Sequence, residues 1–382
     1  MAVLAGLSLI TWIILVFFRG GFWKADQVLP AAEPPSRWPS VTVIIPARDE
    51  AASIRRVVAA HRGCDYPGDL RIVVSDDASS DGTTAEATAA EGAFPAEAIN
   101  VPPLAEGWTG KLWALNAGLE HAEGMASPPE YILLTDADIV VAPDLTRKLV
   151  AAAERKDLAL VSIMAQLDAS QFWGGTLVPA FIYFFQKLYP FPLINKRSSA
   201  VAGAAGGVVL VRKDALDAIG GIGALRGALI DDCTLAQKIK AHAPGTAIGL
   251  FLSSPFAEAI SLRDNSTYKA MELMVARTAF AQLRHNAGLL LGTLFGLGLV
   301  YLVPPAAVLG GPLHNDPRAF WLGLAAWALM IVSYAPTLGR YGKSRREAFM
   351  LPFAATVYGW LTWLSAWRHW RGKGNVWKGR SY

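Results

Sequence analysis

The chain has 382 residues, enough for two or three domains; 53% are hydrophobic and only 17% are charged. This composition is too apolar for an ordinary soluble enzyme and indicates membrane segments joined to a globular part. The formal net charge is +4, but the basic residues gather beside apolar segments. That distribution argues against nucleic-acid binding and favours contact with anionic lipid headgroups. Cys64 and Cys233 form no metal-binding or disulfide pattern.

The first segment, residues 1–19, is predicted to be a membrane anchor. Residues 2–18 are almost entirely apolar, and Arg19 follows them. No positive charge precedes this run beyond the amino terminus, so it is unlike a cleaved signal peptide, and we expect the following domain to face the cytoplasm. The run is short for a span of about 20 residues, so an interfacial anchor is the alternative. Residues 20–40, which include a Pro- and Ala-rich stretch, are predicted to be a linker.

Residues 41–286 are predicted to form an α/β domain. The predicted strands are 41–47, 71–77, 98–101, 131–138 and 158–164, and the predicted helices are 50–61, 82–91, 111–121, 143–156 and 231–240. Strands separated by helices of this length imply a mainly parallel sheet flanked by helices, with right-handed crossovers. Ligands of such sheets bind at the carboxyl ends of the strands.

Three of those strand ends carry polar clusters: residues 46–50, Asp76 with Asp77, and Asp136 with Asp138. Because alternate residues of a strand share a side, we expect Asp136 and Asp138 to face one ligand while Ala137 points away. Two carboxylates there suit Mg²⁺ or Mn²⁺ bridging a diphosphate. A lone Asp-x-Asp is more often a solvated turn, but three polar clusters at one edge favour a binding site.

The second half of the α/β region is less regular. Residues 172–194 are rich in aromatic side chains, and we weigh a core segment against a membrane-touching surface equally. Gly203, Gly206 and Gly207 precede a predicted strand, where glycine permits either a close approach to a ligand or a tight turn. Asp231 and Asp232 open a predicted helix.

Residues 287–370 are predicted to be a C-terminal membrane region with apolar segments at 287–311, 319–338 and 350–367. Tryptophans at the border of the third segment are typical interface anchors. Basic stretches follow both the second segment and the third, and the chain ends in a basic tail, residues 371–382. Both stretches are expected on the cytoplasmic side, so one of the three segments is predicted to be re-entrant or interfacial.

The motifs IPARDE, VSDDASSDGT, GWTGKLWALNAG, LLTDADI and IDDCTLA, in this order, resemble the family 2 glycosyltransferases, whose nucleotide-sugar-binding domain has the GT-A type of fold. The resemblance covers roughly Val41 to Leu262. The flanking membrane segments and the terminal NVWKGRSY are similar to the hopene-associated, HpnB-type members, with carotenoid and ceramide glycosyltransferases as more distant relatives. The resemblance implies a membrane-bound inverting transferase that moves a sugar from a UDP-sugar to a lipid hydroxyl, specifically of a hopanoid. It also implies a location in a bacterial-type inner membrane, with the catalytic domain in the cytoplasm.

The same resemblance implies roles for individual residues. It assigns nucleotide-sugar binding to Pro46, Arg48, Glu50, Asp76, Asp77, Lys111, Asp136, Asp231 and Arg277, and a divalent metal, Mg²⁺ or Mn²⁺, to Asp138 and Asp136. Asp77, with Asp76, would accept a hydrogen bond from the uracil imide. Lys111, at an expected helix start, suits a diphosphate.

The second residue of the acidic pair, Asp232, is the predicted catalytic base for the acceptor hydroxyl. A carboxylate partly buried beside an apolar acceptor has a raised pKa, which makes it a better base. Membrane-bound relatives often carry a Gln-x-x-Arg-Trp signature after this point; here residues 274–278 read MVART, so only Arg277 remains.

Other functions stay open. A polyprenyl phosphate acceptor is already an anion and would need no general base, and a carotenoid or sphingolipid-like acceptor would fit the same apolar surroundings. A non-catalytic membrane scaffold is disfavoured because all the acidic residues expected in these motifs are present. A transporter is disfavoured because the apolar segments contain almost no charge.

Overall fold

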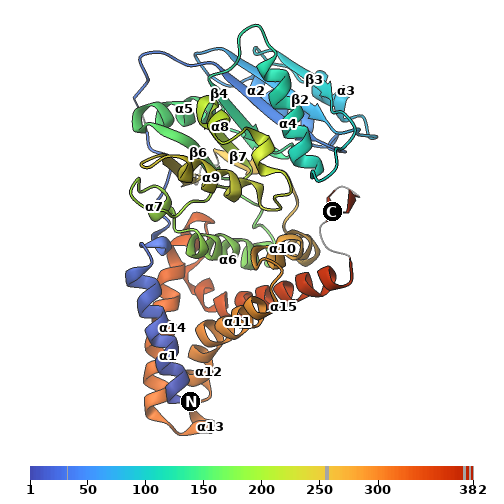
Figure 1. Cartoon of the computed structure of the whole chain (residues 1–382). Coiled ribbons are helices and arrows are strands. Elements are labelled where there is room, and N and C mark those ends of the chain that lie inside the picture. The colour runs from blue at the N-terminus through green and yellow to red at the C-terminus, as the bar shows by residue number, and fades with distance from the viewer. Residues whose placement is uncertain (32, 254–257, 373–375, 378–379, 382) are drawn as a thin grey trace.

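The structure is a computed structural model of the whole chain, which describes residues 1–31, 33–253, 258–372, 376–377 and 380–381. An α/β domain stands on a group of apolar helices, and the N-terminus lies at the tip farthest from that domain (Figure 1). Half of the terminal NVWKGRSY motif lies outside the described residues; within it, β10 (Val376–Trp377) pairs with β11 (Arg380–Ser381).

A seven-stranded sheet in the order β3-β2-β1-β4-β7-β6-β8 forms the centre of the α/β domain. Its strands are β1 (Val41–Ala47), β2 (Leu70–Asp76), β3 (Ala96–Asn100), β4 (Tyr131–Thr135), β6 (Leu158–Met164), β7 (Val208–Arg212) and β8 (Ala247–Leu252). β7 runs antiparallel to β4 and β6, and the other neighbouring pairs are parallel. The predicted mainly parallel sheet is confirmed.

Helices cover both faces of this sheet. They are α2 (Ile54–Arg62), α3 (Thr83–Thr88), α4 (Gly110–Glu123), α5 (Leu145–Lys156), α7 (Phe191–Ile194), α8 (Lys213–Ala218), the 3₁₀ turn η3 (Ile222–Leu225) and α9 (Asp231–His242). Strand alternation divides the core: Val43 and Ile45 of β1 pack in one cluster with α2 and α5, and Ile44 packs in the other with α4 and α9.

The reversed direction of β7 places its first residues at the same edge as the carboxyl ends of β1 and β4. The Thr135 hydroxyl donates to the Gly207 carbonyl at 3.0 Å, and the Asp136 amide donates to the same oxygen at 3.3 Å. The short strands β5 (Ile139–Val141) and β9 (Ala259–Ser261) pair beside this edge. The glycines before β7 therefore form part of the wall where ligands are expected.

The predicted start of α2 is wrong by four residues, whereas that of α3 is nearly as observed. α2 begins at Ile54 rather than at residue 50, because residues 51–53 form a turn. α3 begins directly after Gly82, whose φ of 89° suits glycine and which is one residue before the start of the helix. Asp81 still accepts from the Thr83 amide at 3.1 Å, which satisfies one donor of the first turn.

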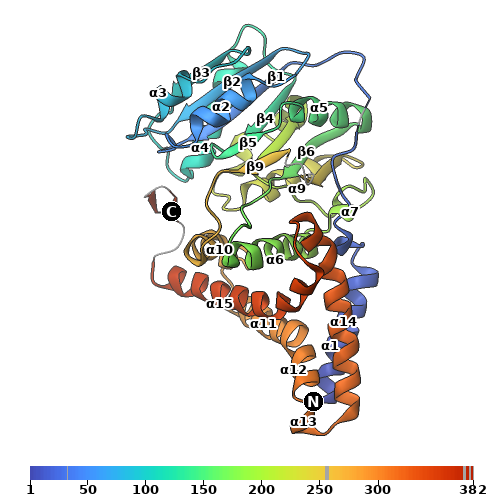
Figure 2. The same ribbon diagram turned by 180° about the vertical axis from the view of Figure 1, so that it is seen from behind.

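The helical part has two groups of helices. One group stands upright in Figure 1: α1 (Ala2–Ile13) with its π-helical extension η1 (Ile14–Phe18), and α14 (Pro317–Arg340). Beside it, α11 (Ala287–Leu297) slopes down from α15 and continues through η4 (Gly298–Leu302) into α12 (Val303–Leu309). The other group lies across it, below the sheet domain: α6 (Phe172–Leu188), α10 (Tyr268–Gln282) and α15 (Leu351–Trp370) (Figures 1 and 2). The 3₁₀ turn η5 (Arg345–Met350) joins α14 to α15, the short α13 (Gly311–His314) joins α12 to α14, and the 3₁₀ turn η2 (Phe22–Lys24) follows η1.

Three helices of the described chain are long and apolar enough to cross a membrane: residues 172–194, 287–309 and 317–340. The N-terminal apolar helix, residues 2–18, is shorter than these. The aromatic segment 172–194, for which a core role and a membrane-touching role stood equal, forms α6 and α7, and Leu177, Val178 and Tyr183 are buried in the cluster that joins α6 to the other apolar helices.

Candidate active site

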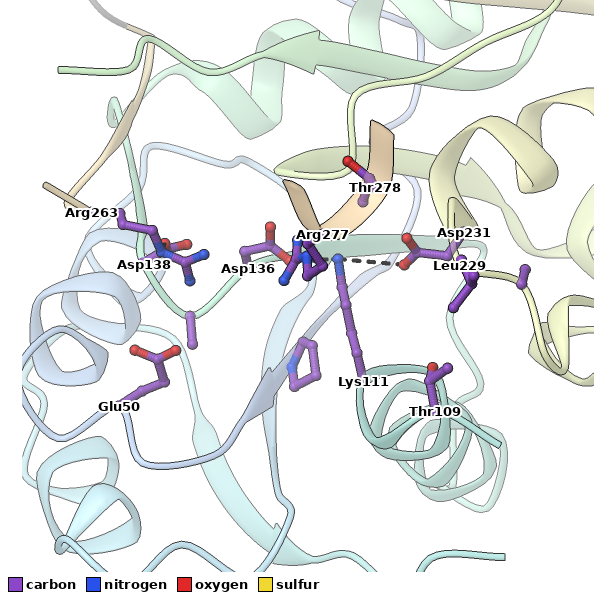
Figure 3. A pocket seen from close by; sticks show the side chains of 13 residues that line it. Glu50, Thr109, Lys111, Asp136, Asp138, Leu229, Asp231, Arg263, Arg277 and Thr278 are labelled. Atoms are coloured by element: carbon purple, nitrogen blue, oxygen red, sulfur yellow. Dashed lines mark ion pairs between the residues drawn. The ribbon is translucent and has the colours of Figure 1, made fainter. Parts of the chain in front are cut away.

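A pocket opens at the carboxyl edge of the sheet, between the α/β domain and α10 (Figure 3). Its lining comes from the ends of β1 and β4, the start of α4, the loop before α9, the segment after β9, and α10. The lining residues are Pro46, Glu50, Thr109, Lys111, Asp136, Ala137, Asp138, Ala228, Leu229, Asp231, Arg263, Arg277 and Thr278. Seven of the residues predicted from the sequence are among them: Pro46, Glu50, Lys111, Asp136, Asp138, Asp231 and Arg277.

Lys111 lies at the centre of the charged groups. It sits in the first turn of α4, where the Thr109 hydroxyl caps the helix by accepting from the Leu112 amide. Its Nζ lies 2.8 Å from Oδ1 of Asp136 and 3.4 Å from Oδ2 of Asp231, so it bridges the end of β4 and the start of α9 (Figure 3). Burial opposes the charge of this ammonium group, but the two carboxylates outweigh burial and raise its pKa.

The Asp136–Asp138 segment is a turn and not the end of the strand. β4 ends at Thr135, and the Ile139 amide donates to the Asp136 carbonyl at 3.2 Å. Strand alternation therefore does not apply, and Ala137 lines the pocket with its two neighbours instead of pointing away. Asp138 is largely buried, and its Oδ2 lies 2.9 Å from Nε of Arg263. Burial raises the pKa of Asp138, although Arg263 acts in the opposite direction.

The two adjacent acidic residues of α9 face different spaces. Asp231 lines the main pocket, whereas Asp232 lines only a smaller cavity behind it, together with Gly206 and Leu235. Oδ1 of Asp232 accepts from the Cys233 amide at 2.7 Å. A Cβ on Gly206 would lie 3.1 Å from Oδ2 of Asp232, so glycine here permits the close approach. Burial, reinforced by the Asp231 carboxylate, raises the pKa of Asp232 to about 7.

Arg48, Asp76 and Asp77 lie at the next strand ends and do not line the pocket. Arg48 donates to the Asp77 carbonyl at 2.6 Å and lies 3.6 Å from its carboxylate. Asp76 accepts from the Ser79 amide and from the hydroxyls of Ser79 and Thr84, so it holds the turn that leads into α3. The structure therefore brings these three together in a separate polar cluster beside the pocket.

The sequence prediction missed several lining residues, of which Arg263 is the most important. Arg263 follows β9 and pairs with Asp138, but neither its neighbours nor its spacing mark it as a site residue. Thr278 could have been predicted from the sequence, because it occupies the position of the tryptophan in the Gln-x-x-Arg-Trp signature. Arg277, the residue before it, lies in the pocket wall; burial, with the nearby Arg263, lowers its pKa.

The carboxylates here suit one kind of metal site only. No group of three or more His, Cys, Asp or Glu side chains arranged to hold a metal occurs among the described residues. Asp136 and Asp138 offer two carboxylates on one turn of the pocket wall. Mg²⁺ is commonly bound by one or two carboxylates together with substrate phosphates and water. The two carboxylates of Asp136 and Asp138 therefore fit a divalent ion that binds together with a diphosphate.

The mostly parallel sheet, with a charged pocket at its carboxyl edge, is the GT-A type of nucleotide-sugar-binding fold. The profile of the family described as glycosyltransferase like family 2 matches residues 39–281, and the chain belongs to this family. The family predicted from the sequence motifs is thus confirmed.

Two curated proteins are similar to part of the chain. An N-acetylglucosaminyltransferase of Mesorhizobium japonicum is 32% identical over 142 residues, covering 37% of this chain and 31% of that protein. A beta-monoglucosyldiacylglycerol synthase of Synechocystis sp. is 26% identical over 227 residues, covering 58% of this chain and 44% of that protein. The aligned part thus spans less than half of each relative.

One solved structure is similar over nearly the whole length. It is a mannosyltransferase of Pyrobaculum calidifontis in complex with GDP-mannose and Mn²⁺. The match has 21% identity and a TM-score of 0.53, and it covers 94% of this chain and 96% of that chain. At this identity the likeness establishes the fold alone, including the combination of sheet domain and helical part.

Proposed function

We propose that the protein transfers a sugar, with inversion, from a UDP-sugar to a hydroxyl group of a membrane lipid. The observation that carries the proposal is the position of Lys111, which bridges Asp136 and Asp231 in a pocket whose opposite wall is α10. Family membership supports glycosyl transfer, and a cation at a helix start beside two carboxylates supports a diphosphate leaving group.

On the donor side, Lys111 and Arg277 would contact the diphosphate, and Asp136 and Asp138 would hold Mg²⁺ or Mn²⁺. When bound, the ion would supply positive charge to the leaving nucleoside diphosphate. Arg263, which pairs with Asp138 and lines the same pocket, would be a further cation for the diphosphate. Pro46 and Glu50 would border the nucleoside, with the Arg48 and Asp77 cluster beside them for the base.

On the acceptor side, Asp232 is the proposed general base. A pKa of about 7 lets a carboxylate accept a proton efficiently near neutral pH. Its cavity shares Lys111, Asp136 and Asp231 with the main pocket, so a hydroxyl that passes Asp231 would meet both the sugar and the base. Attack from that side, opposite the leaving diphosphate, would invert the anomeric centre.

We propose a lipid acceptor because α10, one wall of the pocket, packs on its other side against α15 and α6 of the apolar helices. The Synechocystis relative, named for a glucosylated diacylglycerol, supports an acceptor of this class. The narrower proposal of a hopanoid rests on the resemblance of the sequence motifs to the HpnB-type enzymes. A polyprenyl phosphate is the second candidate, because Arg263 and Arg277 stand together at the pocket and would suit an anionic acceptor.

We also propose a place in a bacterial-type inner membrane, with the α/β domain in the cytoplasm. Basic residues lie at or after the ends of α1 and α14 nearest that domain, namely Arg19, Lys24, Arg340, Lys343, Arg345 and Arg346. The opposite ends carry Arg318 and the amino terminus. Basic residues favour the cytoplasmic side of spanning helices.

The test uses the full chain in lipid vesicles, offered UDP-glucose, UDP-N-acetylglucosamine and GDP-mannose with hopanoid, diacylglycerol or polyprenyl phosphate, with Mn²⁺ or with chelator. We expect nucleoside diphosphate release that depends on the metal, on a UDP-sugar and on an acceptor hydroxyl. If nucleoside diphosphate were released only with polyprenyl phosphate as acceptor, and Asp232→Asn did not change the rate, the acceptor would be polyprenyl phosphate instead. Absence of nucleotide-sugar binding in calorimetry would overturn both.

A further inference from the structure

A stripe of large aromatic side chains runs along the exposed side of α15. Phe353, Trp360, Trp363, Trp367 and Trp370 follow one another at spacings of seven, three, four and three residues, which places them on one face of a helix. The four tryptophans are 36–56% exposed, and Phe353 is 39% exposed. Large aromatic surfaces of this extent are not left in water by soluble proteins and mark an interaction surface.

The opposite face of α15 is packed on the other crosswise helices. The Ser365 hydroxyl donates to the Ala276 carbonyl of α10 at 2.6 Å and accepts from the Phe280 amide at 3.1 Å. The Tyr358 hydroxyl donates to the Leu177 carbonyl of α6 at 2.8 Å. One face of α15 is therefore fixed to the layer below the pocket, and only the aromatic face is available to a partner.

The direction of α15 differs from that of the upright helices. It runs crosswise to α1 and α14 in both views (Figures 1 and 2). Although α15 has 20 residues, it is not among the described helices apolar enough to cross a membrane. Its last turn carries Arg368 and is followed by Arg371, whose guanidinium lies 4.3 Å from the centre of the Trp367 ring.

We propose that α15 lies in the plane of the membrane, with its aromatic stripe at the headgroup level of an anionic bilayer. The proposal rests on the proposed membrane location and adds a specific binding surface to it. Tryptophan prefers this depth because its ring is apolar while its N–H is polar, and Arg371, which follows the helix, would meet lipid phosphates. α15 also packs against α11, one of the helices apolar enough to cross a membrane, so lipid and not a second protein is the partner that its neighbour already implies.

An in-plane α15 reconciles the two basic stretches of the C-terminal region. Residues 340–346 and the arginines after Trp367 would be on opposite sides of the membrane if α15 crossed it once. With α15 in the plane, both lie on the side of the α/β domain, as charge distribution requires. Through Ser365 and its contacts with α10, the helix would also fix the height of Arg277 and Thr278 above the bilayer.

Depth measurements along two helices test this inference. Single cysteines replace Phe353, Trp360 and Trp367, and matched cysteines replace the exposed Trp321 and Val332 of α14. The native Cys64 and Cys233 are buried and can remain. Each variant carries a spin label in vesicles of phosphatidylcholine and phosphatidylglycerol, where oxygen and a water-soluble nickel complex report depth.

We expect the three α15 labels to have the same shallow depth, and the two α14 labels to differ by about 16 Å from the helical rise. A depth change of about 21 Å between positions 353 and 367 would show that α15 spans and would overturn the inference while leaving the membrane location intact. Labels on α15 shielded from both reagents would indicate a protein partner and would also overturn it. Labels on both helices that behave as in water would contradict the proposed membrane location itself.

Discussion

Two lysines show how differently the two halves of the molecule hold a charge. Lys111, in the α/β domain, pairs with the carboxylates of Asp136 and Asp231. Lys187, on α6, makes no ion pair within the described part of the chain; its Nζ donates to the Tyr301 hydroxyl at 2.8 Å. The rings of Tyr301 and Phe184 lie 4.8 and 5.2 Å from this ammonium group. One charge is held by acids and the other by aromatic rings.

The difference indicates which half does chemistry. A pocket whose charges are paired with one another can exchange those partners for a charged ligand as the ligand binds. A helix layer joined by ring contacts and apolar packing offers few such partners, and its contribution is to fix the position of the pocket wall. We therefore expect substitutions at the pocket to change activity, and substitutions in the helix layer to change stability.

The largest expected effect is that of Asp138→Asn. The change keeps the size of the side chain but removes a carboxylate that is needed for a metal-bound diphosphate, and we expect transfer to fall about 10³-fold. Nucleoside diphosphate release at saturating donor and Mn²⁺ measures it. Asp144→Asn, at a surface pair with Lys148, is the matched control and should leave the rate unchanged. Equal rates in both variants would remove Asp138 from the site.

The second largest effect is expected for Asp232→Asn, which should lower the transfer rate about 10²-fold or more if the acceptor is a hydroxyl. The wild-type rate should rise with pH up to about 7, where the base becomes ionised, and the variant should lose this limb. Asp231→Asn is the comparison, because Asp231 faces the pocket: it should weaken donor binding and keep the limb. If Asp231→Asn, and not Asp232→Asn, abolished the rise of the rate with pH, the roles of the two residues would be exchanged.

The same residue gives a stability prediction with a definite sign. Because its folded-state pKa is raised, the folded protein holds a proton on Asp232 that the unfolded chain has lost between about pH 4 and pH 7. Wild-type stability should therefore fall as pH rises through this range, and Asp232→Asn should remove that part of the slope. Thermal unfolding at several pH values measures it, and parallel curves for the two proteins would contradict the raised pKa.

Much of the fold could be predicted because strand and helix periods are local properties of the sequence. The apolar run before Thr135 and the pattern around Lys111 placed β4 and α4 nearly as observed. The reversal of β7 could not be predicted, because its direction depends on pairing with β4 and β6, which are distant in the sequence. The turn at Asp136–Asp138 was hidden because an apolar strand pattern continues on both sides of it.

The site was harder to predict on its far wall. Residues at strand ends share one edge by topology, so Pro46 and Asp136 could be brought together from the sequence. Arg263 comes from beyond the sheet and meets Asp138 only through the tertiary fold. The different directions of Asp231 and Asp232 depend on how closely Gly206 approaches α9, which adjacent sequence positions do not reveal.

Replacing each lysine by methionine sharpens the comparison of the two halves. Lys111→Met leaves Asp136 and Asp231 without their cation, so we expect at least a tenfold weaker donor affinity and a loss of stability of about 2 kcal/mol. Lys187→Met removes a cation from apolar surroundings, and we expect a stability change within about 1 kcal/mol. Calorimetry with the donor and thermal unfolding measure the two effects. A strong loss of donor binding in Lys187→Met would break the division between the halves.

The smallest effect is expected at the contact that joins α15 to α10. Arg368 and Lys269 both pair with Glu272; although burial acts against them, they lower the pKa of that carboxyl group. Arg368→Gln should therefore cost about 0.5–1 kcal/mol, because Lys269 remains as a partner. Since the pKa of Glu272 is lowered, the lost stabilisation should be seen at neutral pH and should fade as the pH falls through this lowered pKa, below the ordinary value of 4.5. Thermal unfolding in vesicles at pH 7 and over a descending pH series checks this, with Arg318→Gln, at the far end of α14, as the control. A large loss of transfer with unchanged stability would mean that this ion pair acts on the pocket itself through α10.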